Sequence, residues 1–251
     1  MLKDETIITE ALKIVKEAKN QGVHLRIMGA IAIRLHTKKF THLLTLMERK
    51  LTDIDLVGYS TQAKMLPSIF QRLGYEQRPT TYALYLANRR IFYKKDLGLK
   101  VDVFLDKLIF CHTIDLRGRL ELDYPTLTPT DLFLEKAQIV QITEKDLKDL
   151  IALLREHEIK DKDDDCINGK YIAKILANDW GFYYTVKLNL DKLKNYLSTI
   201  KAISEEDKSV VLERIKELDE LIEKEPKSLK WKLRSTIGPK KKWYREVETI
   251  T

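Results

Sequence analysis

Aspartates interrupt two segments of the chain that otherwise predict buried β-strands. Residues 52–57 read Thr-Asp-Ile-Asp-Leu-Val and alternate polar with apolar side chains, and residues 99–105 hold Asp102 between two valines. Side chains two residues apart point to the same face of a strand, so the carboxylates of Asp53 and Asp55 project together. Asp is disfavoured in strands, and an unpaired buried charge is costly. The pattern therefore predicts that the three carboxylates meet at one functional site.

Three carboxylates in one place repel one another, and a divalent cation removes that conflict. Mg²⁺ prefers a few carboxylate ligands together with the phosphates of a substrate. A pair of such ions holds the attacking and leaving oxygens of an in-line displacement. We therefore expect Asp53, Asp55 and Asp102 to bind Mg²⁺, in a site for two ions. The alternative is that each aspartate ends its strand or pairs with a Lys or Arg at the edge of a sheet.

The order of the expected elements indicates an α+β fold, a mixed sheet flanked by helices and followed by a C-terminal helical region. A helix at 5–20 and a strand at 23–28 precede Gly29 and a second apolar helix, and residues 37–50 fit either a helix or an ordered excursion. A helix at 60–73 is expected next, followed by a hairpin arm at 81–94. Strand-like runs in this arm are at Tyr82, Leu84 and Leu86 and at 91–93. The remaining expected elements are a strand at 99–105, short strands around 118–124, and helices at about 130–141, 143–157, 167–178, 182–201 and 204–224. Thr143 and Asp146 form a possible capping pair at the start of one helix.

This order of elements divides the chain into three parts. Residues 1–160 predict the catalytic-size α+β domain, and residues 161–226 predict a helical domain. The run at 160–165 has no apolar residue, so it reads as the loop between them. Residues 227–251 form a basic, aromatic tail.

The motifs resemble those of the nucleotidyltransferase, or polymerase-beta-like, superfamily. Met28-Gly29-Ala30 stands where that superfamily has a Gly-Gly or Gly-Ser turn, and Asp53-Ile54-Asp55 and Asp102 stand where it has its metal-binding acids. Residues 134–138 and 144–150 are similar to two helices of one branch, the nucleotidyltransferase toxins of abortive-infection and type IV toxin–antitoxin systems. The resemblance covers roughly residues 20–155. It implies a nucleotidyltransferase-like fold for this part of the chain.

The resemblance also implies an activity, the transfer of a nucleoside monophosphate from an NTP such as ATP to a hydroxyl acceptor, with release of pyrophosphate. The acceptor can be a tRNA, a protein or a small molecule. Asp53 and Asp55 would hold the metal, and Asp102 would complete the site and help to deprotonate the acceptor hydroxyl.

The nucleotide-binding residues implied by the resemblance are Gly29, Ala30, Lys136 and Asp146. The turn would hold the triphosphate through backbone amides, although Ala30 lacks the hydroxyl of the Gly-Ser form. Lys136 would contact a phosphate, and Asp146 matches the acidic residue of the last motif.

Basic charge is concentrated in the tail. Residues 227–251 hold eight Lys or Arg and two Glu, a net charge of +6, while the other 226 residues hold 37 basic and 36 acidic side chains. Trp231, Trp243 and Tyr244 stand among these cations, and such a mixture can contact RNA phosphates and bases. The alternative is a solubilising terminus whose tryptophans dock on the body. An alternative function is therefore a catalytically weak member of the fold that binds RNA or a toxin–antitoxin partner.

Several classes of protein are not expected from this sequence. No apolar run approaches the length of a membrane span, and the N-terminus lacks the features of a signal peptide, so we expect a cytoplasmic protein without membrane contact. Cys111 and Cys166 form no redox or metal motif. The five histidines have no ligand spacing, which argues against a zinc site. Neither a P-loop nor a Rossmann fingerprint occurs.

Overall fold

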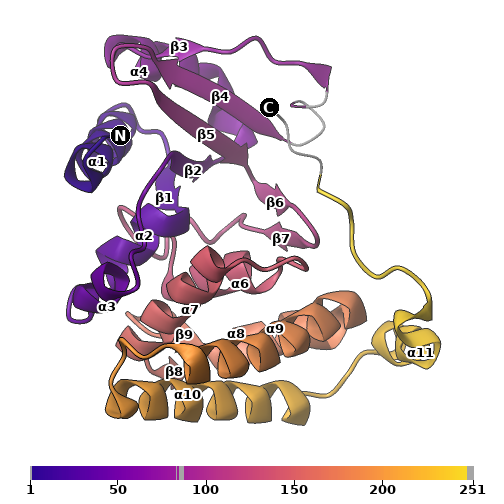
Figure 1. The fold of residues 1–251 in the computed structure, drawn as a ribbon. Helices are drawn as coiled ribbons and strands as arrows, with labels where there is room; N and C mark the ends of the chain where they lie inside the picture. Colours follow the sequence, from indigo (N-terminus) through magenta and orange to yellow (C-terminus); the bar gives the residue numbers. More distant parts are fainter. Residues whose placement is uncertain (1, 83, 85–87, 248–251) are drawn as a thin grey trace.

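A five-stranded mixed sheet forms the centre of the N-terminal half of the computed structural model, which describes residues 2–82, 84 and 88–247 (Figure 1). The strand order is β1 (Leu25–Met28), β2 (Ile54–Gly58), β5 (Leu99–Leu105), β4 (Arg89–Lys94) and β3 (Glu76–Gln77). β2 and β5 are parallel, and the other neighbours are antiparallel. The predicted α+β class with a mixed sheet is confirmed.

Helices flank this sheet and then continue alone to the C-terminal part. In Figure 1, α6 to α10 lie together below the sheet, while α1 and α4 lie beside it. The helices are α1 (Asp4–Asn20), α2 (Gly29–His36), α3 (Thr41–Leu46), the 3₁₀ turn η1 (Ser60–Met65), α4 (Leu66–Arg72), α6 (Pro129–Ala137), α7 (Glu144–Glu156), α8 (Gly169–Asn178), α9 (Trp180–Thr199), α10 (Glu205–Lys224), α11 (Leu229–Ile237) and the 3₁₀ turn η2 (Gly238–Lys240). Within the described ranges, none of the helices combines the length and apolar character that a membrane span requires.

One apolar core connects the sheet to the helices. It runs from Ile7 on α1 through the strands and α6 to Ile222 on α10. α10 packs on α7 and α8, and α9 packs on α6 and α7. The expected boundary near residue 160 stays a prediction, and two short strands, β8 (Ile159–Lys160) and β9 (Ile167–Asn168), lie on either side of the charged loop.

Several of the expected elements differ in the structure. The short strands expected around 118–124 are wrong, because residues 117–125 form turns and bends, and the nearest hairpin lies earlier in the chain, between β6 (Lys107–Ile109) and β7 (Thr113–Asp115). The helix expected at 130–141 ends at Ala137, because the side-chain amide of Asn189 donates to the carbonyls of Ala137 and Ile139 and so takes the place of further helical bonds.

The hairpin arm expected at 81–94 is only half present. Its second strand is β4, which pairs with β3 and β5. Tyr82 and Leu84 are helical rather than extended, since β3 already supplies the partner on that side of β4. Leu86 lies outside the described residues.

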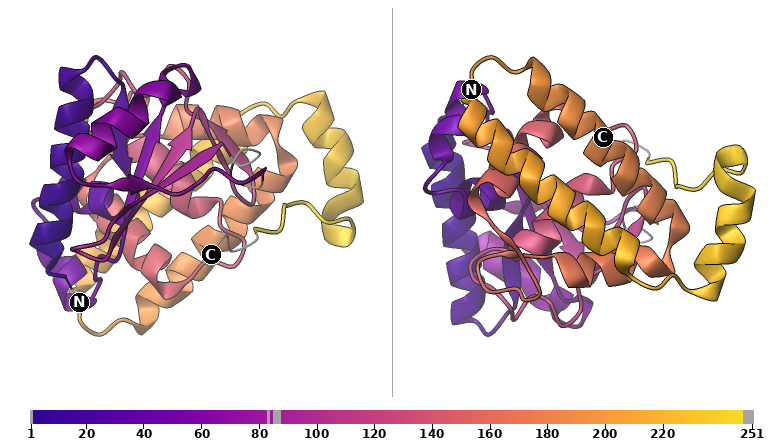
Figure 2. Two further views of the ribbon diagram at one scale, coloured as in Figure 1. Left: turned by 90° about the horizontal axis from the view of Figure 1, so that it is seen from above. Right: turned by 90° about the horizontal axis from the view of Figure 1, so that it is seen from below.

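The tail lies against α9 through its tryptophans. Trp231 meets the ring of Tyr183 edge to face, and Trp243 meets Tyr184 in the same way. The indole N–H of Trp243 also donates to the hydroxyl of Thr185 at 3.0 Å. Both views of Figure 2 show α11 at one edge of the molecule, with the chain returning from it toward the body. The tail is therefore docked on α9 through Trp231 and Trp243.

Candidate active site

Asp53, Asp55 and Asp102 lie together, as their strand positions predict. Asp53 immediately precedes β2, and the parallel pairing of β2 with β5 sets Asp55 directly opposite Asp102. One carboxylate oxygen from each residue lies within 4.8 Å of the other two. Three hard oxygen donors at this spacing fit a site for Mg²⁺.

Gly29 brings the turn between β1 and α2 against this cluster. β1 pairs with β2 so that Met28 faces Asp55, and the chain then turns at Gly29 with φ +67°. A Cβ atom at this position would lie 2.9 Å from Oδ2 of Asp55. Only glycine combines the left-handed backbone with so close an approach. The Gly turn and the Asp-x-Asp strand therefore form one unit.

A carboxylate already bonds the amide of this turn. The N–H of Gly29 donates to Oε2 of Glu135, on α6, at 3.0 Å. The resemblance implied that this amide holds phosphate, so Glu135 occupies the position where a phosphate oxygen would be expected. Sequence reasoning missed Glu135, although it stands next to Lys136.

Unbalanced negative charge surrounds Asp55. Burial raises the pKa of Asp55 to about 8, and the nearby carboxylates of Asp53, Glu135 and Asp102 raise it in the same direction. Lys136 acts in the opposite direction but does not balance them. A divalent cation would supply the missing positive charge, so the electrostatics of the described residues fit a bound metal.

Two cations neutralise Asp102. The Arg89 guanidinium lies 2.8 Å from Oδ1, and the Lys100 ammonium lies 2.9 Å from Oδ2. Arg89 therefore binds the third aspartate of the cluster. Lys100 precedes Asp102 by two residues on the same strand face, which is a signal that sequence reasoning could have used.

Lys136 lies inside a network of acids rather than in open solvent. Its Nζ is 3.3 Å from Asp149, 3.4 Å from Asp146 and 3.7 Å from Glu135. Burial on its own would lower the pKa of Lys136, but these carboxylates raise it above the ordinary value. Its charge acts on Asp55, so it belongs to the same site.

Asp146 and Asp149 have structural partners in this network. Asp146 caps α7 by accepting hydrogen bonds from the backbone and the hydroxyl of Thr143, so the predicted capping pair is confirmed. Asp149 accepts two bonds of 2.9 Å from the Arg49 guanidinium. Ala30 follows Gly29 in the first turn of α2 and remains half-buried.

A pocket with several basic side chains is connected to the aspartates through Thr52. It has a volume of about 580 Å³, and Thr52 lines it while donating its hydroxyl to Asp53 at 2.8 Å. The other lining residues are Glu48, Arg49, Lys50, Thr143, Glu144, Lys145 and Lys148. Arg49 is already bound to Asp149, so Lys50, Lys145 and Lys148 are the cations of this pocket that suit a polyanionic ligand.

Comparison with known proteins gives a weak likeness to a solved structure. No protein-family model matches the chain, and neither does any curated protein. Among solved structures, the chain is similar to the antibiotic-resistance factor ANT(2'')-Ia. The TM-score is 0.41 at 15% identity, and the match covers 60% of this chain and 83% of that chain. This likeness is too weak to assign an activity, so the function has to be inferred from the site itself.

Proposed function

We propose that the protein is a metal-dependent nucleotidyltransferase that moves a nucleoside monophosphate from an NTP to a hydroxyl acceptor and releases pyrophosphate. The observation that carries this proposal is the meeting of Asp53, Asp55 and Asp102 against the turn at Gly29. The partners of the reaction are the NTP and an acceptor that is a tRNA, a protein or a small molecule.

In this proposal, each residue has a role that follows from its position. Asp53 and Asp55 hold Mg²⁺, which when bound neutralises the phosphate charge that develops during transfer. Asp102 completes the site and lies where it can accept the proton of the acceptor hydroxyl, once Arg89 or Lys100 releases it. The basic pocket beside Thr52 binds the triphosphate.

Gly29, Ala30 and Lys136 orient the nucleotide in the same proposal. The Gly29 amide donates to a phosphate oxygen when Glu135 releases it. Lys136 and Asp146 shape the site from α6 and α7, with the ammonium acting on the cluster by its charge. Catalysis then consists of positioning and charge neutralisation.

An assay with each labelled NTP and Mg²⁺ tests this proposal. Bulk tRNA, a protein mixture and small hydroxyl compounds are offered in turn as acceptors, and pyrophosphate release is measured together with label transfer. We expect transfer that Asp53→Asn abolishes, whereas Asp96→Asn, a change to an exposed turn residue, leaves it unaffected. Pyrophosphate release that persists in Asp53→Asn would contradict the proposal.

A second candidate is a catalytically weak protein of the same fold that binds RNA or a toxin–antitoxin partner. Two observations favour it: Arg89 and Lys100 already neutralise Asp102, and Glu135 already bonds the Gly29 amide. Under this proposal, NTP and Mg²⁺ bind weakly and no transfer occurs. Equilibrium binding of NTP in the presence and absence of Mg²⁺ separates the two candidates.

A further inference from the structure

Two histidines that lie far apart in the sequence are neighbours at the C-terminal end of α2, whereas Gly29 is at its N-terminal end. His36 is the last residue of α2, and His157 directly follows α7. Their ring centroids are 5.5 Å apart at an interplanar angle of 75°. Asp165, at the end of the charged loop before β9, joins them, and one potential ligand atom from each of the three residues lies within 4.8 Å of the other two.

His157 offers a buried nitrogen with no partner. The residue is 2% exposed, and its Nδ1 lies 3.0 Å from the backbone carbonyl of Asp165. A carbonyl can only accept, so Nδ1 carries the proton and Nε2 carries a lone pair. Nε2 has no hydrogen-bond partner among the described residues. Leaving a buried polar atom unpaired is costly, and a metal ion would satisfy it.

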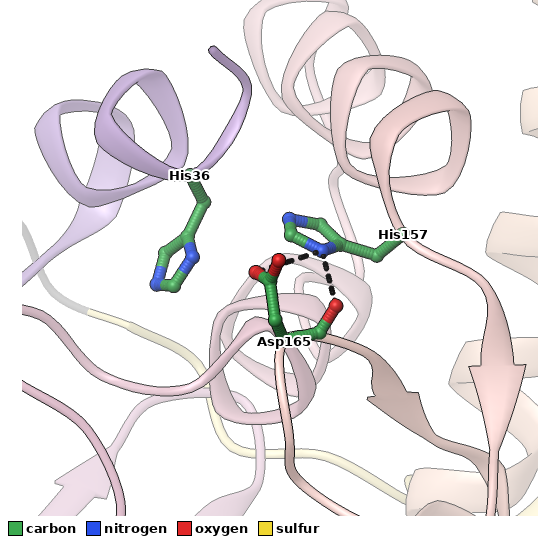
Figure 3. A group of neighbouring side chains, drawn as sticks. All are labelled: His36, His157 and Asp165. Carbon is green, nitrogen blue, oxygen red and sulfur yellow. Dashed lines mark hydrogen bonds and ion pairs between the residues drawn. The ribbon is translucent and has the colours of Figure 1, made fainter. Parts of the chain in front are cut away.

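His36 is held in the tautomer that leaves its other nitrogen available. Its Nε2 is 2.8 Å from the hydroxyl of Thr126, 2.9 Å from the carbonyl of Leu127 and 3.4 Å from the carboxylate of Asp123, and the carbonyl can only accept. Donation to these acceptors leaves the lone pair on Nδ1. Metal-binding histidines regularly donate their second nitrogen to a carbonyl or a carboxylate in this way. Figure 3 shows the His36 ring turned toward His157 and Asp165.

Asp165 supplies an oxygen from the third side. Its backbone has φ +50°, and its carboxylate lies 3.5 Å from Nδ1 of His157, the nitrogen that carries the proton, so ligation together with Nε2 of His157 requires the Asp165 side chain to turn away from this contact. Figure 3 shows both its carboxylate and its carbonyl directed at that ring. The side chain is 82% exposed, so it is free to make this turn and reach the ligand distance of about 2.0–2.2 Å that a bound ion requires.

We propose that His36, His157 and Asp165 bind one Zn²⁺ ion. Two imidazoles and one carboxylate suit Zn²⁺, whereas Mg²⁺ prefers oxygen donors only. A pocket of about 670 Å³ is lined by His36, Asp123 and Asp165, so a water ligand and the entering ion have a route to the three residues. The ion joins the end of α2 to the end of α7 and to the β8–β9 loop.

The absence of ligand spacing in the sequence does not argue against this site, because its ligands come from three separate segments. Zinc sites with short ligand spacings are recognised in a sequence, and sites assembled by the tertiary fold are not. The proposed ion is independent of the proposed transferase activity. It would act on α2 at the end farthest from the aspartates and hold that helix in place.

Zinc binding by the whole, EDTA-treated protein tests the proposal. Zn²⁺ is titrated against a chromophoric chelator in the presence of excess Mg²⁺, and thermal unfolding is followed in parallel. We expect one Zn²⁺ per chain and a higher melting temperature with Zn²⁺. Co²⁺ substitution should give the visible absorption bands of a four-coordinate site.

Variants identify the ligands. Asp165→Ala changes an exposed side chain and should weaken Zn²⁺ binding on the order of 100-fold, while the far-UV circular dichroism stays the same. His36→Asn should do likewise, and His157→Ala is judged only if it remains folded. Matched controls are Asp161→Ala in the same loop and His42→Asn, an exposed histidine, and both should bind Zn²⁺ as the unchanged protein does.

The Asp53→Asn variant shows which site the ion occupies. Unchanged Zn²⁺ stoichiometry in this variant supports the histidine site, and loss of the ion in this variant would overturn it. Equal Zn²⁺ affinity in Asp165→Ala and Asp161→Ala would also overturn the proposal, as would the absence of stoichiometric binding.

Discussion

Asp55 and Asp102 lie directly opposite each other where β2 and β5 run parallel. This single register point brings together two acids that are 47 positions apart in the sequence. Asp102 has two basic partners, whereas carboxylates surround Asp55. Asp55 therefore carries most of the charge imbalance that a metal ion would relieve, and it is the position where substitution gives the most information.

Asp55→Asn should stabilise the metal-free protein while abolishing Mg²⁺-dependent turnover. The pKa of Asp55 is raised to about 8 by burial and by neighbouring acids, so the folded state resists ionisation of this group. The native protein then loses stability as pH rises from about 4 to about 8, and the variant does not. Urea unfolding in EDTA should show a gain of about 1–3 kcal/mol at pH 8 and little gain at pH 5. A gain of equal size at both pH values would contradict this explanation.

Gly29→Ala should disrupt the cluster through its contact with Asp55. The added Cβ atom would lie 2.9 Å from Oδ2 of Asp55, which is too close. The left-handed backbone at this position adds strain for any residue other than glycine. Gly98→Ala is the matched control, because Gly98 also has a positive φ but no atom within 4 Å of its added Cβ. The control should lose about 1–2 kcal/mol of unfolding free energy, and Gly29→Ala should lose clearly more and weaken Mg²⁺ binding. Equal losses would mean that the approach of Asp55 has no energetic consequence.

Lys136→Ala should destabilise the fold, beyond any effect on nucleotide binding. Removal of the ammonium leaves Asp149, Asp146 and Glu135 without their shared cation in a buried network. Breaking such a network costs about 3–5 kcal/mol. Lys145→Ala, an exposed change on α7, should cost less than about 0.5 kcal/mol. Chemical denaturation of both variants measures the difference, and a Lys136→Ala protein of native stability would show that the acids find other partners.

The sequence predicts the positions of the aspartates and not their partners. Side-chain alternation along the two strands was enough to place Asp53, Asp55 and Asp102 at one site. The bond from Gly29 to Glu135 depends on how α6 packs beneath the sheet, and local patterns do not contain that information. The same is true of His36 and His157, which only the tertiary fold brings together. The helix ending at Ala137 was misjudged because a side chain from α9 determines it.

Acidic pH should weaken the fold through His112. This ring is buried, stacks on Phe182 and bonds to the Thr185 hydroxyl, and burial lowers its pKa to about 4. The unfolded chain takes up the proton near pH 6.5, so stability is lost as pH falls from about 6.5 to about 4, by up to about 3 kcal/mol. His112→Phe keeps a stacking ring and should remove this part of the pH dependence. Urea unfolding at pH 7 and pH 4.5 makes the comparison, with His24→Phe as the control at a partly exposed position.

Removal of the tail after Pro226 separates docking from RNA binding. Trp231 and Trp243 pack on α9, so truncation should lower the stability of the helical part, whatever the acceptor. If the tail also binds RNA, truncation should weaken RNA affinity and reduce the log–log salt slope by about 0.7–0.9 for each phosphate that the tail neutralises. The control changes the exposed residues Lys230, Lys240 and Lys241 to Gln and keeps the docked tryptophans. This variant should lose RNA affinity without losing stability, and unchanged affinity and slope in both proteins would leave the tail with docking as its role.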